Sequence, residues 1–586
     1  MNTVLECLRD QALREPNKTA IFSRIPAGTW EGITWKEFWD RVITLSTGLT
    51  AHGLRPGDRL AIILSNGLEW ELTHFASLAC GAIVIGLDAH DTAQRLENVL
   101  AHADVNALVI GSDAILAKLG PRAESVKLVV CLSKPQIVNG NVRLLSWEQI
   151  NSPLDNAAVT PLSLPEKKDP ATIIYTSGTT GEPKGILYSH GQLALACNAI
   201  LATLPPARSD ARFVCWLPLS NLFQRVMNLC AVATGASLYM VADPLKVLDF
   251  VQEIEPDVFI GVPRFYEKLA SGIKTKLAAE KGLNRHIAHW ALSIGQRYAA
   301  ARKTNIQPAP FLRLQYVLAN QLVLRRLRGL LGNRLQYLIS GSAAIPVWIL
   351  EFFESFGCLV LEAYGLSENI LPIAMNTPGE YRFGTVGKVI AENNVKLDED
   401  GEVLVKGPGL FSGYFGDPES FEQATKDGYY RTGDFGSFDE QGFLRLTGRK
   451  SEIIKTSAGR RIALPAIESV LRELPWVDHA VVIGAGRKCL AALLTYDRKT
   501  IHDASEIRSE LVSKISAKLS RHEQPAAALI LARAFSVDGG ELTPNLKLRR
   551  AEIERKYADL IDNLFRSLDK AGQDTVPAEF LLEMYE

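Results

Sequence analysis

The most informative segment of the chain is the run Tyr175-Thr176-Ser177-Gly178-Thr179-Thr180-Gly181-Glu182-Pro183-Lys184-Gly185. It follows the apolar residues 171–174, whose composition indicates a strand. Glycines let the backbone N–H groups of a loop point inward, the hydroxyl groups add donors, and the lysine adds positive charge. The segment therefore predicts a loop that binds phosphate groups. Glycine follows the lysine where a P-loop has Ser or Thr, so an ordinary P-loop NTPase is disfavoured.

Short apolar runs alternate with amphipathic stretches around this loop. Residues 59–64 and 107–110 have the composition of buried strands, and residues 72–78 have the periodicity of a helix. This alternation predicts parallel sheets covered by helices on both faces. Beyond about residue 384, period-two patterns at 394–398 and 401–407 flank an acidic-glycine turn and indicate an antiparallel hairpin.

The chain has 586 residues, which exceeds one ordinary domain. We expect an α/β fold whose large N-terminal domain, residues 1–447, contains doubly wound mixed sheets. Residues 384–447 would form a β-rich subdomain of that unit. A hinge at 448–451 and a small, mobile α+β C-terminal domain at 452–586 complete the expected organisation.

The composition excludes several functional classes. Hydrophobic residues make up 47% and charged residues 22% of a chain with a net charge of −1, which is typical of a globular protein without global attraction for nucleic acid. The eight cysteines lack metal-ligand spacing, and the first residues lack the pattern of a signal peptide. We therefore expect a cytoplasmic protein with at most peripheral membrane contact. The basic, apolar stretch from Arg313 to Arg334 would suit substrates that partition into membranes, although a solvated helix face is the preferred interpretation.

The loop resembles the signature of the superfamily of acyl-CoA synthetases, nonribosomal-peptide adenylation domains and luciferases. Six further segments match that superfamily in the right order, and seven motifs in order are not a chance result. They are Leu217-Pro218-Leu219-Ser220, Ser340-Gly341-Ser342-Ala343-Ala344, Tyr364-Gly365-Leu366-Ser367-Glu368, Tyr430-Arg431-Thr432-Gly433-Asp434, Gly448-Arg449-Lys450 and Leu542-Thr543-Pro544-Asn545-Leu546-Lys547. Residues 262–269 and 542–550 are most similar to long-chain fatty acid–CoA ligases.

This resemblance implies an AMP-forming ligase. Such an enzyme uses ATP to convert a hydrophobic carboxylic acid, either a medium- or long-chain fatty acid or a bulky acid, into an acyl-adenylate. Transfer to coenzyme A then gives acyl-CoA and AMP. The implied catalytic residues are Lys547, Glu368 and Ser367. Lys547 would bridge the substrate carboxylate and the α-phosphate, Glu368 would bind Mg²⁺, and Ser367 would donate to a phosphate oxygen.

The resemblance also implies a set of ATP- and AMP-binding residues. Tyr364 would offer its flat face to adenine, while Asp434 and Arg449 would bind the ribose. The full set is Thr176, Ser177, Gly178, Thr179, Thr180, Gly181, Lys184, Gly341, Ser342, Ala343, Glu362, Ala363, Tyr364, Gly365, Asp434 and Arg449.

Coenzyme A would bind after the C-terminal domain rotates about a hinge at Ser451. Lys455 and Gly459 would then face its pantetheine arm, and the glycine would permit close approach.

The chain departs from the superfamily pattern at several positions. Asn221 stands at the expected entrance of the acyl pocket, where most relatives have histidine, and Ser451 replaces a charged hinge residue. These departures leave two alternatives open. The chain could be an acyl-AMP ligase that loads an acyl carrier protein, or a nucleotide-binding homologue that has lost catalysis.

Overall fold

The computed structural model describes residues 3–26, 28–120, 126–134, 143–152, 164–177, 183–206, 208–303, 308–457, 461–474, 476–496, 504–531, 533–536, 539–543, 548–570 and 581–585. The chain divides into two compact units. Unit 1 contains residues 1–395, 405–430 and 440–444, and unit 2 contains residues 396–404, 431–439 and 445–586.

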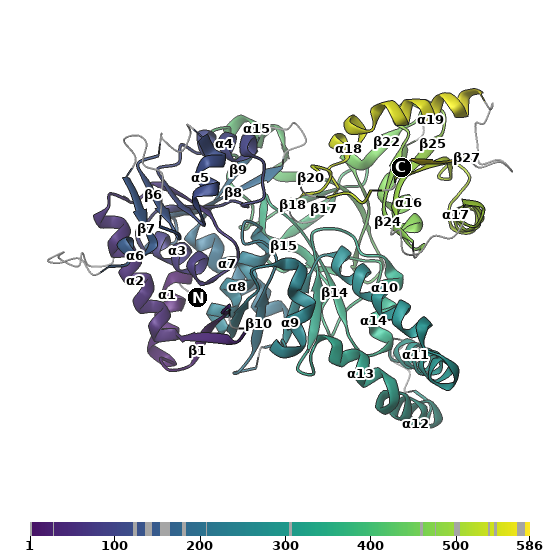
Figure 1. Ribbon diagram of the computed structural model, residues 1–586, viewed down its shortest axis with the longest axis horizontal. Helices are drawn as coiled ribbons and strands as arrows, with labels where there is room; N and C mark the ends of the chain where they lie inside the picture. The colour runs from purple at the N-terminus through teal and green to yellow at the C-terminus, as the bar shows by residue number, and fades with distance from the viewer. Residues whose placement is uncertain are drawn as a thin grey trace. The chain divides into compact units, whose positions relative to one another are not determined.

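The first sheet of unit 1 has the strand order β7-β6-β5-β3-β4-β8-β9 (Figure 1). Its strands are parallel except for β9, which pairs antiparallel with β8. Strands β4, β5 and β6 are buried along their whole length, which explains their uninterrupted apolar sequences. The strand bounds are β3 Arg59–Ile63, β4 Ile83–Gly86, β5 Ala107–Ile110, β6 Leu128–Cys131, β7 Arg143–Ser146, β8 Pro170–Ser177 and β9 Pro183–Ser189.

The second sheet of unit 1 has the order β16-β15-β14-β13-β12-β10-β11-β1-β2. Its strands are parallel from β14 to β1, and the outer strands β2, β15 and β16 pair antiparallel. The bounds are β1 Thr19–Arg24, β2 Trp30–Thr34, β10 Arg212–Cys215, β11 Ser237–Met240, β12 Val258–Gly261, β13 Tyr337–Ser340, β14 Val360–Leu366, β15 Asn369–Met375 and β16 Lys388–Val389.

Helices pack between and around these sheets. Helix α3 contacts β3 and β4 of the first sheet and β1 of the second, and α7 contacts β8, β9 and β15. Helix α8 packs on α7, β10 and β11. The larger helices of unit 1 are α1 Val4–Arg14, α2 Trp35–Ala51, α3 Leu68–Ala79, α4 Ala93–His102, α5 Asp113–Leu119, α7 His190–Thr203, α8 Leu222–Thr234, α9 Val247–Ile254, α10 Pro263–Ala279, α11 Gly282–Lys303, α12 Pro310–Ala319 and α14 Val347–Ser355.

A further sheet follows in the chain, with the order β17-β18-β20-β19 and with β21 also paired to β20. The hairpin predicted at 394–407 is present as β17 and β18. The bounds are β17 Asn394–Leu397, β18 Glu402–Lys406, β19 Thr425–Lys426, β20 Tyr429–Phe438 and β21 Leu444–Arg449, with α15 at Pro418–Gln423.

The C-terminal part of unit 2 is an α+β sandwich with the strand order β24-β25-β26-β27. Successive residues of β24 and β25 point to opposite faces and enter two separate hydrophobic cores, one with α16 and α17 and one with α18 and α19. The bounds are α16 Leu464–Leu471, β24 Val477–Ile483, β25 Leu490–Tyr496, α17 Ala504–Lys518, β26 Pro525–Leu531, α18 Arg550–Lys556, α19 Ala558–Lys570 and β27 Leu581–Tyr585.

The predicted fold class, a large α/β part with mixed sheets followed by a smaller α+β part, is confirmed. Mobility of the C-terminal part and the exact domain boundaries stay predictions. Within the described residues, no helix combines the length and the apolar character that a membrane span requires.

Candidate active site

The signature segment forms a β-hairpin. Strand β8 continues to Ser177 and β9 begins at Pro183, so that Thr176 lies opposite Lys184. The strand is longer than the predicted residues 171–174 because pairing with β9 satisfies the backbone groups beyond them. The expected phosphate-binding residues Gly178, Thr179, Thr180 and Gly181 lie outside the described residues, as do the side chains of Thr176 and Ser177.

Lys184 lies beside an aromatic ring. Its Nζ is 4.8 Å from the centroid of the Tyr414 ring, which is a cation–π distance. The backbone N–H of Phe415 donates to the carbonyl of Gly185 at 2.7 Å, and Tyr414 forms a β-bridge with Ile186. The segment around Tyr414 therefore runs along β9 and determines where the Lys184 ammonium lies.

Ser367 and Glu368 form the turn between β14 and β15. The Tyr188 hydroxyl of β9 donates to the Ser367 carbonyl at 2.5 Å. The Tyr414 hydroxyl donates to Oε1 of Glu368 at 3.0 Å. Tyr414 thus contacts Lys184 through its ring and Glu368 through its hydroxyl. The structure brings together the cation of the signature hairpin and the expected metal ligand, although the sequence separates them widely.

Two tyrosines surround the Glu368 carboxylate. The hydroxyls of Tyr414 and Tyr430 are 3.3 Å apart. Burial raises the pKa of both phenols, and the negative charge of Glu368 raises it further. Both side chains therefore remain protonated and can donate hydrogen bonds to Glu368. Sequence interpretation missed both roles: it quoted Tyr430 only as part of a motif, and Tyr414 has no surrounding pattern that distinguishes it from a core tyrosine.

The register of β13 and β14 places Ser340 opposite Glu362, so the glycine turn at 341–343 follows directly beside residues 362–364. A side chain at Gly341 would meet the Phe223 ring at 3.3 Å and the Ala363 carbonyl at 3.6 Å. Ser342 has a φ of 72°, in the left-handed region. The turn needs small residues because α8 and β14 both approach it closely.

Glu362 is a buried carboxyl group with a perturbed pKa. Its side chain accepts hydrogen bonds from the backbone amides of Ile345 and Gly384, while Oε2 has no partner among the described residues. Burial raises the pKa of Glu362 to about 8, and the two amides offset only part of that effect. Tyr364, two residues along the same strand, is also buried. At neutral pH, the carboxyl beside the expected adenine platform is therefore mostly protonated.

We expect Glu362→Gln to remove a pH dependence of folding stability. The folded-state pKa of about 8 lies above the ordinary value of 4.5, so the stabilising contribution is fully present below that value and is lost as pH rises through about 8. Within this window, each pH unit is worth up to about 1.4 kcal/mol. Because glutamine resembles the neutral acid, the folding stability of the variant should not fall as pH rises through this window. Thermal unfolding at about pH 5, 7 and 9 tests this, and parallel profiles for the two proteins would contradict it.

Asn221 is the N-cap of helix α8. Its side-chain oxygen accepts the backbone N–H of Phe223 at 3.0 Å, and asparagine is among the preferred N-cap residues. This local role was missed in the sequence interpretation, which placed Asn221 at the acyl pocket entrance. The preceding residues Leu219 and Ser220 lie against Gly86, where a side chain would meet the backbone within 3.3 Å.

The two residues expected at the ribose form an ion pair in unit 2. Nε of Arg449 donates to Oδ1 of Asp434 at 2.8 Å, and Asp434 is buried. The Asp434 backbone N–H donates to the Thr432 hydroxyl at 3.1 Å, which in turn donates to the Val403 carbonyl at 2.7 Å. The motif loop is therefore anchored to β18.

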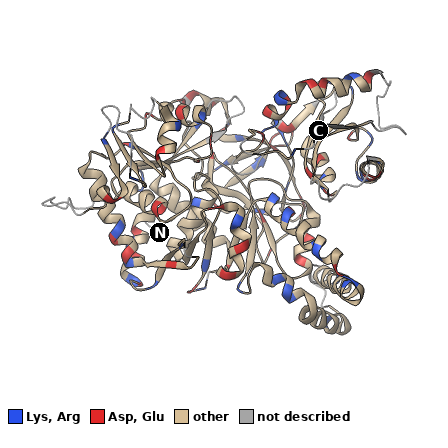
Figure 2. Ribbon diagram, in the orientation of Figure 1, with Lys and Arg blue, Asp and Glu red and all other residues tan. Residues whose placement is uncertain are grey.

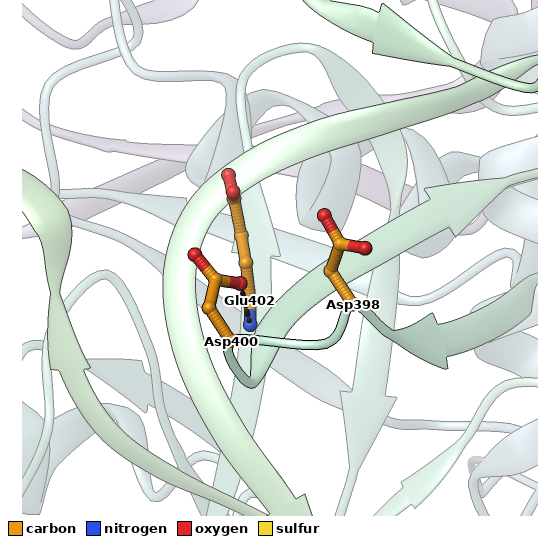
Figure 3. Close-up of side chains that lie close together, drawn as sticks. All are labelled: Asp398, Asp400 and Glu402. Atoms are coloured by element: carbon orange, nitrogen blue, oxygen red, sulfur yellow. Dashed lines mark hydrogen bonds between the residues drawn. The ribbon is translucent and has the colours of Figure 1, made fainter.

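An acidic cluster lies on the turn between β17 and β18. Figure 3 shows Asp398, Asp400 and Glu402, whose carboxylate oxygens lie within 4.8 Å of one another. Among the described residues, this is the group whose spacing could hold a metal ion. However, Glu402 is only 1% exposed and already accepts Nε of Arg431 at 3.0 Å and the backbone N–H of Gly433 at 3.0 Å. We therefore assign Glu402 to the positioning of the Asp434 loop.

We expect Glu402→Ala to destabilise unit 2 by about 2 kcal/mol, because it leaves the Gly433 N–H without its acceptor and leaves Arg431 only the more distant carboxylate of Asp398, at 3.6 Å. If Asp434 binds the ribose, the same change should raise the KM for ATP several-fold. Asp400→Ala is the matched control, since Asp400 is exposed and its carboxylate accepts the Glu402 backbone N–H at 3.1 Å. Denaturant unfolding and ATP titrations measure both effects, and equal effects of the two substitutions would contradict the assignment.

Lys547 and Gly459 lie outside the described residues, as do the side chains of Ser451 and Lys455. The backbone of Ser451 belongs to a short 3₁₀-helix at Lys450–Glu452, and Lys455 ends β22 (Ile453–Lys455), which pairs with β23 (Arg461–Ala463). A β-bridge joins Leu542 to Leu548, which stand on either side of Lys547 in the sequence.

A buried carboxylate ties together described residues before and after this part of the chain. Glu541 is fully buried, and it pairs with Arg533 and with Lys556 at 2.6 Å. The carbonyl of Glu541 accepts the backbone N–H of Arg549 at 2.8 Å. Glu541 and Arg549 therefore have defined positions within unit 2.

The AMP-binding enzyme family matches residues 8–415, which is more than half of the chain. The chain belongs to this family. The AMP-binding enzyme C-terminal domain matches residues 451–569. The superfamily resemblance inferred from the motifs is confirmed.

Curated relatives of this AMP-binding enzyme match almost its whole length. The long-chain-fatty-acid–CoA ligase FadD15 of Mycobacterium tuberculosis is 29% identical over 94% of this chain and 95% of its own. The long-chain-fatty-acid–CoA ligase ACSBG2 of Xenopus laevis is 26% identical over 94% of this chain and 82% of its own.

Solved structures share the fold of this AMP-binding enzyme. The anthranilate CoA ligase AuaEII in complex with anthranoyl-AMP has a TM-score of 0.76 at 18% identity and covers 96% of this chain and 98% of its own. The A-PCP didomain of carboxylic acid reductase from Segniliparus rugosus in complex with AMP has a TM-score of 0.78 at 18% identity, covering 97% and 83%.

Proposed function

We propose that this AMP-binding enzyme is an AMP-forming acid–thiol ligase that activates a hydrophobic carboxylic acid, such as a medium- or long-chain fatty acid, for transfer to coenzyme A. The main support is its likeness to long-chain-fatty-acid–CoA ligases over 94% of its length. The contact of Tyr414 with both Lys184 and Glu368 adds a structural reason, since it gathers groups suited to a triphosphate.

The residues at Glu368 fit a magnesium ion. The carboxylate is partly exposed, and one of its oxygens accepts a hydrogen bond from Tyr414 at 3.0 Å, so lone pairs remain for a hard cation. Mg²⁺ is commonly held by one or two carboxylates together with substrate phosphates and water, which requires no protein cage. When bound, the ion would neutralise part of the phosphate charge. Tyr414 would orient the carboxylate toward it.

The proposed first step joins the acid to AMP. The signature hairpin with Lys184 would hold the β- and γ-phosphates, and Lys547 would reduce the repulsion between the acid carboxylate and the α-phosphate. A carboxylate oxygen forms a bond to the α-phosphorus while the bond to pyrophosphate breaks. In the second step, the thiolate of coenzyme A attacks the acyl carbon and AMP leaves. Glu362, Tyr364, Asp434 and Arg449 would bind the nucleoside in both steps.

The proposed acceptor of the acyl group is coenzyme A. One structural neighbour is a didomain that includes a PCP domain, and Asn221 and Ser451 depart from the motif pattern, so an acyl carrier protein is the second candidate.

The experiment gives the purified enzyme ATP, Mg²⁺ and a panel of fatty and aromatic acids, and measures pyrophosphate release. Mass spectrometry then detects the thioester with coenzyme A or with a carrier protein. Thioester on coenzyme A supports the proposal, thioester only on the carrier protein supports the second candidate, and no pyrophosphate from any acid would indicate a homologue without catalysis.

A further inference from the structure

Helix α12 and its continuation carry an apolar face that is open to solvent. The exposed side chains are Phe311, Leu314, Val317, Leu318 and Leu322, with exposed fractions between 43% for Leu322 and 70% for Phe311. Their spacing of three and four residues places them on one face of the helix, which continues as a π-helix at Asn320–Leu324. Single exposed hydrophobic residues are ordinary, whereas a continuous stripe of this length is a feature of interaction surfaces.

The opposite face of this helix is firmly packed. The rings of Tyr316 and Tyr298 of α11 stack with centroids 3.9 Å apart, and Ala319 is buried. Helix α11 in turn approaches α14 so closely that a side chain at Gly295 would collide with the Ser355 carbonyl. Figure 1 shows α12 beyond α11, on the side away from the sheets of unit 1. The apolar stripe is therefore held outward by a packed helix pair.

The charges around the stripe have one sign. Between residues 281 and 350 the chain contains no Asp or Glu, although the net charge of the whole chain is −1. In Figure 2 the helices of this region accordingly carry blue and no red. The basic residues of this stretch are Lys281, Arg285, Arg297, Arg302, Lys303, Arg313, Arg325, Arg326, Arg328 and Arg334.

Two of these arginines continue directly from the stripe. Arg325 and Arg326 are exposed, and no ion pair or hydrogen bond joins either of them to another described residue. Arg328 differs, because it donates to the Phe356 carbonyl at 2.7 Å and to Asn320 at 2.5 Å. Arg325 and Arg326 are therefore available to an external anion, next to the apolar side chains.

We propose that the face formed by Phe311, Leu314, Val317, Leu318, Leu322, Arg325 and Arg326, here named the α12 face, docks on an anionic lipid bilayer. Apolar side chains of an interfacial helix enter the boundary between headgroups and acyl chains, and adjacent arginines bind lipid phosphates. A second copy of the chain is disfavoured, because a symmetric contact would bring like charges together. This proposal does not depend on the catalytic function, and it replaces the solvated helix face preferred from sequence.

The experiment is co-sedimentation of the full chain with vesicles of phosphatidylcholine alone or mixed with phosphatidylglycerol. We expect binding to the anionic vesicles that weakens as salt increases. Leu314→Ser combined with Leu318→Ser should lower the partition coefficient at least about tenfold, because both apolar side chains would leave the membrane interface. Arg325→Gln combined with Arg326→Gln should lower it by roughly fivefold per arginine.

The matched control is Leu13→Ser combined with Arg14→Gln, which changes an adjacent exposed apolar and basic pair on α1. This variant should bind vesicles as the wild type does. Thermal unfolding verifies that each variant is folded, and Phe311→Ser at the most exposed position of the stripe provides a second, milder substitution. The proposal fails if the wild type stays in the supernatant, if neutral vesicles bind equally well, or if the control loses binding to the same extent. Sedimentation velocity that shows a dimer lost in the stripe variants, without vesicle binding, would assign the face to a second copy.

Discussion

Replacement of Lys547 by alanine is expected to reduce acyl-adenylate formation by about two to three orders of magnitude. The carboxylate of the acid and the triphosphate repel each other, and a positioned cation relieves this repulsion most strongly as the new bond forms. ATP binding should persist, because Lys184, Asp434 and Arg449 remain. Thioester formation from a synthetic acyl-adenylate and coenzyme A should change only a few-fold, since the thiolate then attacks an electrophilic acyl carbon and no carboxylate has to approach the triphosphate.

Single-turnover pyrophosphate release and the isolated thioester reaction measure these two steps separately. Lys518→Ala is the matched control, because Lys518 belongs to the same unit and pairs with Glu473 at 2.7 Å on the surface. Adenylation at the wild-type rate in Lys547→Ala would remove this lysine from the mechanism. A uniform loss in both steps would instead indicate damage to the fold of unit 2.

Glu368→Gln is expected to reduce turnover by about a hundredfold and to weaken the dependence of the rate on Mg²⁺ concentration. The amide still accepts the hydrogen bond from Tyr414, but it lacks the negative charge that a hard cation requires. Tyr414→Phe separates the two contributions. This substitution keeps the Glu368 carboxylate and removes one of its two tyrosine donors, so we expect a loss of about tenfold with the Mg²⁺ dependence retained.

Magnesium titrations of the pyrophosphate-release rate distinguish these variants. Glu419→Gln, at an exposed position of α15, is the control for loss of a carboxylate in unit 1. An unchanged Mg²⁺ profile in Glu368→Gln would show that the ion is held elsewhere. Equal losses of Mg²⁺ dependence in Tyr414→Phe and Glu368→Gln would mean that the tyrosine does more than orient the carboxylate.

Much of the fold followed from local sequence patterns. The strands predicted at 59–64 and 107–110 are present as Arg59–Ile63 and Ala107–Ile110, and the helix predicted at 72–78 is part of the longer helix Leu68–Ala79. Apolar runs and apolar periodicity reflect burial directly. The bounds of β8 were predicted less well. Its last residues are hydroxylated, and the sequence predicted a loop there. In the structure they belong to the strand because they pair with β9.

The partners of the candidate site were harder to predict. Tyr414 and Glu402 belong to no recognised pattern, and their importance depends on contacts with residues distant in sequence: Tyr414 with Lys184 and Glu368, and Glu402 with Arg431 and Gly433. Likewise, the raised pKa of Glu362 results from its burial in the folded chain. Such properties arise only when separate segments meet.

The sequence by itself determined the family and the expected chemistry, because each motif is a contiguous run of residues. Residue types and motif order can be recognised without knowledge of the tertiary structure. It also indicated a basic, apolar segment after residue 313. Only the tertiary structure decided that Lys184 and Glu368 share Tyr414, and that the apolar side chains of α12 face solvent while Tyr316 packs inward. The physical reason is that burial, hydrogen-bond partners and exposed faces depend on packing between segments, which no local pattern specifies.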